Sequence, residues 1–194
     1  SRLPFPIYQY LERGADDEYS LRNNTSAFEH YQLQPRALAD VSQLDTRCQL
    51  FGRTLSMPLA LAPLGMAGLY ARRGEVQAAR AAEAVGVPFS LSTVGICAVE
   101  EVHAACAQPC WFQLYMLRDR GAVTAVLQRA LAAGCDTLLF TVDLPVAGIR
   151  RRDIRNGMLD AGWRGRLAKA TQLALSPHWL VDVGIAGKPH HFGN

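Results

Sequence analysis

The apolar positions between residues 58 and 145 recur in a fixed order: a short apolar run, a loop, and a stretch with helical spacing. The apolar runs begin near residues 59, 89, 111 and 137, and the first three predict strands at residues 59–63, 89–92 and 111–115. The helical stretches are residues 74–85, 99–107 and 121–133. Because strands that alternate with helices assemble into a parallel sheet, the sequence predicts an α/β fold.

The third helical stretch and the run after it show this order most clearly. One face of the helix is apolar, through Val123, Val126, Leu127, Ala130 and Leu131. Gly134 is the expected helix stop. We interpret residues 138–142 as a buried strand that carries Thr141 and Asp143 to its carboxyl end. An ordinary core strand with an incidental polar end is the alternative for this segment alone.

Two parallel architectures fit such a repeat. A doubly wound dinucleotide-binding sheet carries a glycine-rich fingerprint after its first strand, and the sequence contains neither G-x-G-x-x-G nor a P-loop. A (β/α)8 TIM barrel requires about 250 residues. The chain has 194 residues and four strand units, so we predict the N-terminal helices and about the first four βα units of such a barrel.

Segments on either side flank the repeat within one predicted domain. Helices are expected at residues 5–14 and from Asp16 onward, followed by a wrap with a possible hairpin around Gly52. The predicted segments are residues 1–57 for the leading helices and wrap, 58–150 for βα units one to four, and 151–194 for a loop region.

The charge is uneven along the chain. The net charge is +3, yet the residues from Arg150 onward contain eight Lys and Arg against three Asp. No basic face with interleaved aromatic residues is present in the body, which argues against nucleic acid as a partner. An anionic substrate or a membrane surface suits the basic tail better. The longest uncharged runs are too short and too broken to span a bilayer.

The five cysteines are an odd number without the spacing of a disulfide framework, which indicates reduced thiols in a reducing compartment. The spacing of His103, Cys106 and Cys110 resembles a metal site. However, His103 and Cys106 fall on a predicted helix, Cys110 enters a strand, and no fourth ligand is near. We therefore predict no metal.

Polar groups follow each predicted strand and are the main functional signal. Gly65 after the first strand lets a ligand approach the backbone closely. The polar side chains are Ser92 on the second strand, Gln113 and Tyr115 on the third, and Thr141 on the fourth. Carboxyl ends of parallel barrel strands meet at one edge. Neutral donors and acceptors that converge there suit a flat heteroaromatic ligand. For any one of these residues alone, a satisfied polar side chain in a barrel layer is the alternative.

Five stretches in the same order resemble the FMN-dependent 2-hydroxy-acid dehydrogenase and oxidase family. They are residues 8–15 (YQYLERGA), 56–66 (SMPLALAPLGM), 91–93 (LST), 111–115 (WFQLY) and 141–150 (TVDLPVAGIR). The resemblance covers nearly the whole chain. Residues 68–76 and 112–121 look most like the bacterial respiratory L-lactate dehydrogenases of that family.

The resemblance implies roles for individual residues. FMN would be contacted by Pro63, Leu64, Gly65, Ser92, Gln113 and Thr141. The substrate carboxylate and hydroxyl would be held by Tyr10, Tyr115 and Arg150. Arg150 suits this role because a fixed guanidinium pairs well with a carboxylate. Asp143 is expected to support the site indirectly.

The family's catalytic histidine, a lysine beside the flavin and the phosphate loops would come later than residue 194. The resemblance therefore implies that this chain holds no catalytic base and needs the C-terminal half of the same enzyme. Both ends are expected to be cuts in a longer protein. The implied reaction oxidises an L-2-hydroxy acid, with L-lactate favoured, to the 2-keto acid. The C2 hydrogen would pass to flavin N5, and electrons would pass to a quinone or another carrier.

Alternatives remain at this point. The substrate could be mandelate or glycolate, and the chain could be a catalytically silent half-barrel that acts as an assembly partner. An unrelated barrel enzyme with a different phosphorylated ligand is a third interpretation. A homo-oligomer (a tetramer) and a peripheral position on the cytoplasmic side of the inner membrane, or in the cytoplasm, are expected. Membrane contact is assigned to the amphipathic stretch 163–179, for which a packed insert is the alternative.

Overall fold

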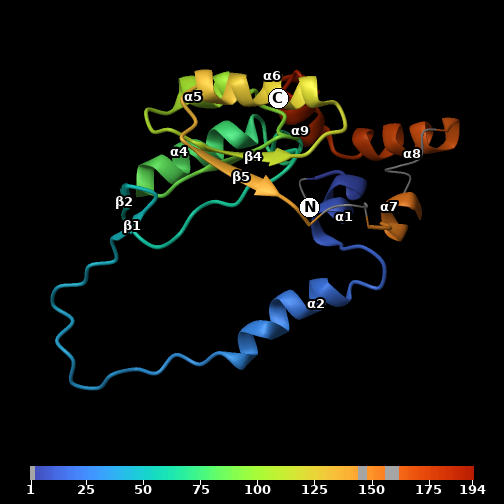
Figure 1. The fold of residues 1–194 in the computed structure, drawn as a ribbon. Helices are drawn as coiled ribbons and strands as arrows, with labels where there is room; N and C mark the ends of the chain where they lie inside the picture. Colours follow the sequence, from blue (N-terminus) through green and yellow to red (C-terminus); the bar gives the residue numbers. More distant parts are fainter. Residues whose placement is uncertain (1–2, 144–147, 156–161) are drawn as a thin grey trace. The chain divides into compact units, whose positions relative to one another are not determined.

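The computed structural model describes residues 3–143, 148–155 and 162–194 (Figure 1). Its contacts divide the chain into two compact units. The first unit joins Ser1–Leu44 to Val146–Leu180, and the second joins Asp45–Pro145 to Val181–Asn194. Each unit is described by itself below.

The second unit is built on a parallel sheet of three strands in the order β3-β4-β5. The strands are β3 (Ser90–Ser92), β4 (Trp111–Tyr115) and β5 (Thr137–Thr141). An isolated parallel bridge between Leu61 and Phe89 places the segment around Leu61 next to the segment that leads into β3. The spatial order therefore follows the chain order without the reversal that marks a doubly wound sheet. This arrangement is that of successive barrel strands.

The first predicted strand is much shorter than expected. Residues 59–63 were expected to form a strand, but only Leu61 pairs, with its N–H donating to Pro88 O at 2.9 Å and its carbonyl accepting from Ser90 N at 3.1 Å. Pro58 and Pro63 bracket the run. A proline has no N–H for a ladder, so pairing cannot extend through either position.

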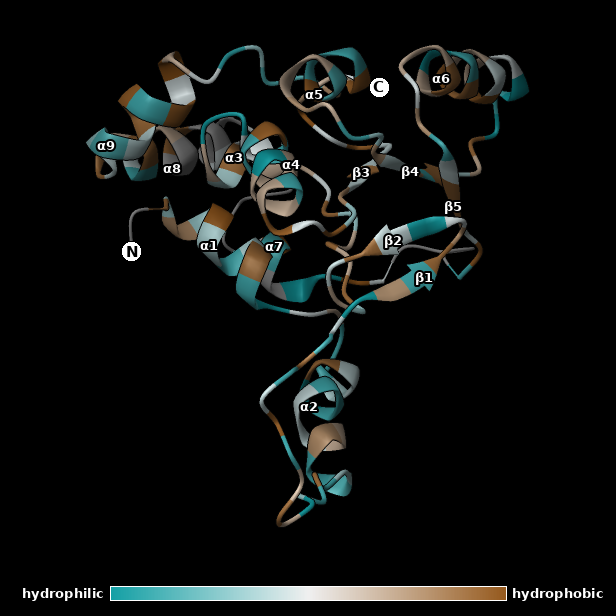
Figure 2. Cartoon of the chain, turned by 90° about the vertical axis from the view of Figure 1, so that its left-hand side faces the viewer, coloured by the Kyte–Doolittle hydropathy of each residue, from teal (hydrophilic) through white to brown (hydrophobic). Residues whose placement is uncertain are grey.

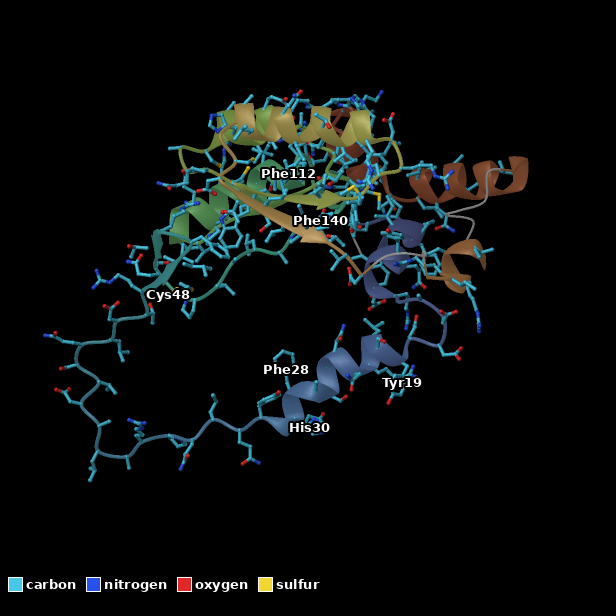
Figure 3. The ribbon with its side chains drawn as sticks, in the orientation of Figure 1. Tyr19, Phe28, His30, Cys48, Phe112 and Phe140 are labelled. Carbon is cyan, nitrogen blue, oxygen red and sulfur yellow. The ribbon has the colours of Figure 1, made fainter. Side chains whose placement is uncertain are left out.

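Three helices accompany the strands: α4 (Gly74–Val85), α5 (Val99–Ala105) and α6 (Arg120–Ala132). Figures 1 and 2 both draw α5 and α6 on one side of β4 and β5. The core between sheet and helices contains Leu91, Val99, Val102, Phe112, Leu114, Val123 and Ala130. Phe112, labelled in Figure 3, is 1% exposed and Leu91 is fully buried. Apolar burial of this size is the main source of the unit's stability.

The helix ends follow from local chemistry. Gly86 and Gly134 have φ of 71° and 82°, a left-handed conformation that glycine adopts without strain. Gly86 directly follows α4, and Gly134 is the second residue after α6. At the start of α6, the Asp119 carboxylate accepts from the N–H groups of Gly121 at 2.8 Å and Ala122 at 3.2 Å. These contacts satisfy amide groups that the first helical turn leaves unpaired.

The burial predicted for the fourth strand is wrong. Leu138 and Phe140 on β5 are 50% and 49% exposed, and Val142 beyond it is 77% exposed. In the described sheet β5 is an edge strand with β4 as its neighbour. Its largely apolar residues are visible in Figure 2, and Phe140 is labelled in Figure 3. A barrel strand is buried only when the next βα unit packs beside it.

The hairpin predicted around Gly52 is confirmed. Its strands are β1 (Cys48–Leu50) and β2 (Arg53–Leu55), which pair antiparallel. Phe51 and Gly52 both have positive φ, 49° and 75°, as a two-residue type I′ turn requires. The Phe51 ring meets Trp111 edge-on at 5.7 Å between centroids. A short helix that was not predicted, α3 (Ala67–Tyr70), precedes α4.

The first unit is helical. It contains α1 (Phe5–Glu12), α2 (Tyr19–Ser26), a 3-10 turn (Ala27–His30), α7 (Arg151–Arg155), α8 (Trp163–Ala174) and α9 (Pro177–Trp179). Helix α1 contacts both α7 and α8. Within the predicted wrap, residues 31–44 form no helix or strand and are exposed.

The helical stretch 163–179 is broken rather than continuous. Helix α8 ends at Ala174, and Pro177 begins α9. A proline disfavours the helical conformation of the residue before it, and Ser176 accordingly has φ −125° and ψ 60°. A π-helical turn (Leu180–Ile185) follows. In the described part of the chain, no helix combines the length and apolar character needed to cross a membrane.

Candidate active site

A row of hydrogen-bonded side chains crosses the three strands of the second unit. Ser92 Oγ donates to Gln113 Oε1 at 3.0 Å, and Gln113 Nε2 donates to Thr141 Oγ1 at 2.7 Å. Ser92 and Gln113 are only 2% and 3% exposed, while Thr141 is half-buried. We call these three residues the polar row. The sequence-based expectation that they converge is confirmed, and their role stays a prediction.

The register of the sheet explains why the polar row forms. Ser92 pairs with Gln113 across β3 and β4, and Tyr115 pairs with Thr141 across β4 and β5. Side chains two residues apart on a strand share a face, so Gln113 and Tyr115 point the same way. Ser92, Tyr115 and Thr141 are the last residues of their strands, and Gln113 stands two residues before the end of β4. The half-buried Tyr115 therefore borders the polar row.

Thr93 belongs to the same site and was not among the predicted site residues. Its Oγ1 donates to Gln113 O at 2.5 Å and accepts from Tyr115 N at 3.2 Å, and its own N–H donates to Gln113 Oε1 at 3.3 Å. Thr93 is 5% exposed. It fixes both the side chain and the backbone of β4 at the site. A second hydroxyl directly after Ser92 was the available signal.

The loop after the first bridge contains Pro63, Leu64 and Gly65. Pro63 and Gly65 are half-buried and Leu64 is 50% exposed. A Cβ on Gly65 would lie 2.8 Å from Val94 Cγ2, and Met66 N donates to Val94 O at 2.9 Å. Close packing against the next loop thus favours glycine at position 65. That a ligand approaches the backbone there stays a prediction.

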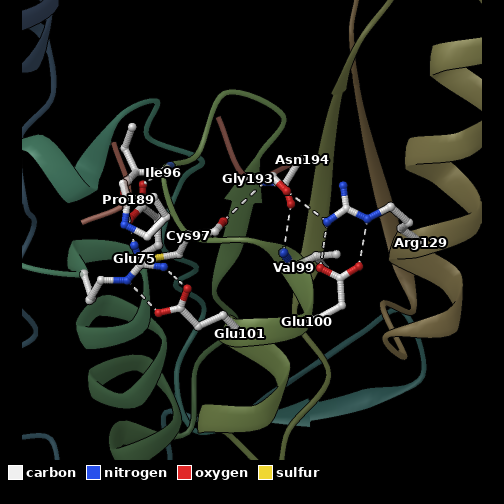
Figure 4. A network of polar contacts seen from close by, with 11 residues as sticks. Glu75, Ile96, Cys97, Val99, Glu100, Glu101, Arg129, Pro189, Gly193 and Asn194 are labelled. Atoms are coloured by element: carbon white, nitrogen blue, oxygen red, sulfur yellow. Dashed lines mark hydrogen bonds and ion pairs between the residues drawn. The ribbon is translucent and has the colours of Figure 1, made fainter. Parts of the chain in front are cut away.

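The loop after β3, residues 93–98, is held by side chains from distant positions (Figure 4). Glu75, 1% exposed, accepts from Ile96 N at 2.8 Å. Asn194 Oδ1 accepts from Val99 N at 2.8 Å, and its Nδ2 donates to Ser92 O at 3.2 Å. Asn194 therefore connects the start of α5 to the backbone of the polar row.

Close backbone packing and ion pairs support this arrangement. Gly193 N donates to Gly95 O at 3.0 Å, and a Cβ on Gly193 would lie 2.5 Å from Ala98 N. Arg129 pairs with Glu100 at 2.7 Å and donates to Gly193 O at 2.9 Å (Figure 4). The Arg129 guanidinium lowers the pKa of the Glu100 carboxyl below its usual value. Helices α5 and α6 are thereby joined beside the loop.

Tyr10 and Arg150 form a second group, within the first unit. The guanidinium of Arg150 lies over the Tyr10 ring, 4.0 Å from its centroid. Its Nε pairs with Asp153, and its Nη2 donates to the carbonyl oxygens of Tyr10 and of Arg13, the latter at 2.9 Å. Asp153 is 1% exposed and was not a predicted site residue. These contacts fix the orientation of Arg150.

The remaining donors decide what this group can bind. An arginine carries five N–H donors, and the bonds just given employ those on Nε and Nη2. Within the part of the chain that the structure describes, the Nη1 donors are the ones left for a ligand. A rigid guanidinium with spare N–H groups matches a carboxylate. Asp143, which was expected to support the site, is exposed.

The polar row fits an uncharged ring better than an ion. Its donors and acceptors are an amide and hydroxyls, all neutral. Across residues 3–143, 148–155 and 162–194, no cluster of three or more His, Cys, Asp or Glu could hold a metal ion. Beyond the bonds described, Gln113 has a second amide N–H and Thr141 a hydroxyl proton. Both can donate to the acceptor-rich edge of a flavin ring.

Successive parallel strands with a polar row at their carboxyl ends define this chain as part of a (β/α)8 barrel with a ligand site at that edge. A model of one protein family matches residues 1–192, and its description is FMN-dependent dehydrogenase. The chain belongs to the FMN-dependent dehydrogenase family.

Relatives and solved structures agree with this assignment. The chain is 51% identical over 194 residues to an L-lactate dehydrogenase of Azorhizobium caulinodans and 51% identical over 193 residues to one of Alcaligenes faecalis. Each alignment covers 100% of this chain and 50% of the relative. The chain thus spans about half the length of the curated relatives it matches.

Among solved structures, the monotopic membrane protein (S)-mandelate dehydrogenase matches with a TM-score of 0.87 and 34% identity. That match covers 97% of this chain and 50% of the other. A mandelate oxidase solved with (S)-mandelic acid matches with a TM-score of 0.76 and 39% identity, over 80% of this chain and 46% of the other. The barrel architecture predicted from the sequence is confirmed.

Proposed function

We propose that this chain is the N-terminal half of an enzyme that oxidises an L-2-hydroxy acid, with L-lactate favoured, to the 2-keto acid. The observation that carries the proposal is the polar row, Ser92–Gln113–Thr141, at the carboxyl edge of a barrel sheet. Family membership supplies the cofactor class, and relatives named L-lactate dehydrogenase at 51% identity favour the substrate.

We assign FMN contacts to Pro63, Leu64, Gly65, Ser92, Gln113 and Thr141. The amide of Gln113 and the hydroxyl of Thr141 would donate to acceptor atoms of the ring. Ser92 would act partly through Gln113, whose Oε1 it fixes. The Pro63–Gly65 loop would contribute backbone and apolar surface. FMN, when bound, supplies an acceptor for the hydride equivalent from substrate C2.

We assign the substrate contacts to Tyr10, Tyr115 and Arg150. Arg150 would pair with the substrate carboxylate through its Nη1 donors. The Tyr10 ring and Asp153 hold the guanidinium in place, which lowers the entropy cost of binding. Tyr115, beside the polar row, carries a phenol that can hydrogen-bond the substrate hydroxyl or carboxylate.

The catalytic base is proposed to lie in the C-terminal half of the same enzyme. The polar row and the Tyr10–Arg150 pair lack a histidine in the hydrogen bonds described. The exposed apolar residues of β5 are suited to the next βα unit of a barrel. On this proposal the chain contributes orientation and charge, whereas proton abstraction and binding of the FMN phosphate belong to the other half.

Mandelate is the second candidate substrate. It is favoured by the structural match to (S)-mandelate dehydrogenase, at 34% identity. The 51% identity to L-lactate dehydrogenases makes lactate the first choice. A glycolate-type reaction and a catalytically silent assembly partner are the remaining outcomes that an assay can distinguish.

We also propose peripheral contact with the cytoplasmic side of the inner membrane through α8. Leu167 on α8 is 58% exposed and Leu175 after it is 82% exposed. The structural neighbour with a TM-score of 0.87 is a monotopic membrane protein. We also propose that electrons pass from the enzyme to a quinone or another carrier. The enzyme is proposed to assemble as a homo-oligomer such as a tetramer.

The experiment compares substrate turnover by the complete enzyme containing this chain and by its Arg150→Met variant. L-lactate is expected to be turned over faster than (S)-mandelate. Removal of the carboxylate-pairing guanidinium should lower kcat/KM for lactate about 100-fold or more, since a charged hydrogen bond contributes about 3 kcal/mol. Arg47→Met is the matched control, because Arg47 is exposed and pairs with Asp45.

Unchanged lactate turnover in Arg150→Met would contradict the substrate assignment. Faster turnover of (S)-mandelate than of L-lactate by the parent enzyme would show that mandelate, the second candidate, is the better substrate. A protein that retains FMN but turns over no 2-hydroxy acid would be the silent partner.

A further inference from the structure

Two cysteines of the second unit lie in contact. Cys110 Sγ and Cys135 Sγ are 3.3 Å apart, and both are free thiols. They are separated by 25 residues in the sequence. A disulfide bond has an S–S distance of about 2.05 Å, so the sulfur atoms need to move only slightly to join.

The pair lies at the opposite end of the strands from the polar row. Cys110 directly precedes β4, and Cys135 stands two residues before β5. The polar row lies at the carboxyl ends of these same strands. A bond between the two sulfur atoms would therefore tie β4 to β5 without contacting the proposed flavin site.

The two thiols are chemically unequal. The hydrogen bond with Cys135 lowers the pKa of Cys110, and the same contact together with burial raises the pKa of Cys135. The Cys110 thiol thus loses its proton first, while Cys135 keeps its own. A thiolate beside a protonated thiol is the arrangement in which one sulfur attacks an oxidant and the other resolves the product.

The remaining cysteines are poorly suited to compete. Cys97 is fully buried, and burial raises its pKa to about 12. Burial also raises the pKa of Cys106. Cys48 lies on the β1–β2 hairpin, and its sulfur has no sulfur neighbour among the described contacts. The chemistry therefore selects Cys110 and Cys135 out of five thiols.

A small cavity reaches Cys110. Its lining includes Arg53, His103, Cys106, Gln108 and Cys110, and it has room of about 20 Å³ for water-sized molecules. That is enough for about one such molecule. Arg53 Nη1 donates to the carbonyl of Pro109, next to Cys110, at 3.2 Å. A neutral oxidant little larger than water suits this entrance, whereas a bulky disulfide does not.

We propose that Cys110 and Cys135 form a modification site for hydrogen peroxide, which converts them into a reversible disulfide. The Cys110 thiolate attacks one peroxide oxygen; an S–O bond forms, the O–O bond breaks, and hydroxide leaves and takes up a proton. Cys135 sulfur then attacks the sulfenyl sulfur of Cys110. The S–S bond forms, the S–O bond breaks, and the thiol proton leaves with the oxygen in a second water molecule.

The test treats the complete protein with hydrogen peroxide, blocks the remaining thiols, and analyses intact mass and proteolytic peptides. The expected result is a loss of two hydrogen masses, a peptide pair joined through Cys110 and Cys135, and reversal by dithiothreitol. Cys110→Ser and Cys135→Ser should each abolish the joined peptides. Cys106→Ser is the matched control, because Cys106 lines the same cavity, and it should retain them.

Results on the parent protein alone can overturn the proposal, so the test does not require the variants to fold. Joined peptides that contain a different cysteine would do so. Irreversible oxidation of Cys110 without a bond to Cys135, or no reaction at peroxide concentrations that oxidise a free thiol, would do so as well.

Discussion

Gln113 connects more parts of the candidate site than any other residue described above. Its amide oxygen accepts from Ser92 Oγ and from the N–H of Thr93, and its amide nitrogen donates to Thr141. Three strands thus meet at one side chain that is 3% exposed. A buried network of this kind is stable only when every member has its partner.

Replacement of Gln113 by Leu should therefore be costly. The change keeps the approximate volume but removes the acceptor of the buried Ser92 hydroxyl proton. The Thr93 N–H keeps its bond to the Gln113 backbone carbonyl at 3.0 Å. Buried polar groups without partners cost about 1–3 kcal/mol, so the free energy of unfolding in urea should fall by about that amount.

Gln49→Leu is the control for this substitution, because Gln49 donates to Thr54 on the exposed hairpin. Its effect should stay within about 0.5 kcal/mol. Equal unfolding free energies for the two variants would show that the polar row does not stabilise the sheet.

Residues that the sequence did not reveal act through specific hydrogen-bond partners. Thr93 and Asn194 bond groups that are distant in sequence, on Gln113 and Ser92 respectively, whereas Asp153 pairs with Arg150, three residues before it. A sequence pattern reports which face or end of an element a residue occupies, but not which backbone group from another segment meets it. The polar row was predictable because its members lie at or near the carboxyl ends of neighbouring parallel strands, where topology alone brings them together.

At the scale of elements, prediction succeeded where local chemistry decides the boundaries. Helix α4 ends at Val85, as predicted, because Gly86 follows in the left-handed conformation. Strand β4 matches its predicted bounds because an apolar run buried on both faces has few alternatives. The run at 59–63 failed because its prolines limit pairing, and β5 is exposed because burial depends on a neighbouring element.

The contact between α5 and α6 gives a pH-dependent prediction. Glu100 has a lowered pKa because of Arg129, so its folded state binds a proton less readily than its unfolded state. The stabilisation is present at neutral pH and is lost as the pH falls through the folded-state pKa. Since the Glu100 side chain is 53% exposed, the contribution should be below about 1 kcal/mol.

Arg129→Met tests this prediction through thermal or urea unfolding at a series of pH values. The variant should be less stable than the parent at pH 7, and the difference should shrink as the pH falls and Glu100 becomes protonated. Arg118→Met, before α6, is a control for loss of one positive charge. A difference that stays constant from neutral to acidic pH would exclude the Glu100 pair as its cause.

At the scale of the whole molecule, the two groups of site residues belong to different units of the chain. The polar row lies in the second unit, and the Tyr10–Arg150 pair lies in the first. We propose that FMN is contacted mainly by the polar row and the substrate carboxylate by Arg150. The apolar residues of β5 and the alignment to half of each relative both agree with a further half that completes the barrel.

The most direct test of the central claim is the dissociation constant of FMN for the complete protein and for Thr141→Val. Valine keeps the shape of threonine but removes the hydroxyl, and loss of one hydrogen bond of about 1.4 kcal/mol should weaken FMN binding about tenfold. Thr124→Val on α6, where the hydroxyl bonds only its own helix at Arg120 O among the contacts described, should leave the constant unchanged. If both variants bind FMN as tightly as the parent, the polar row does not hold the flavin.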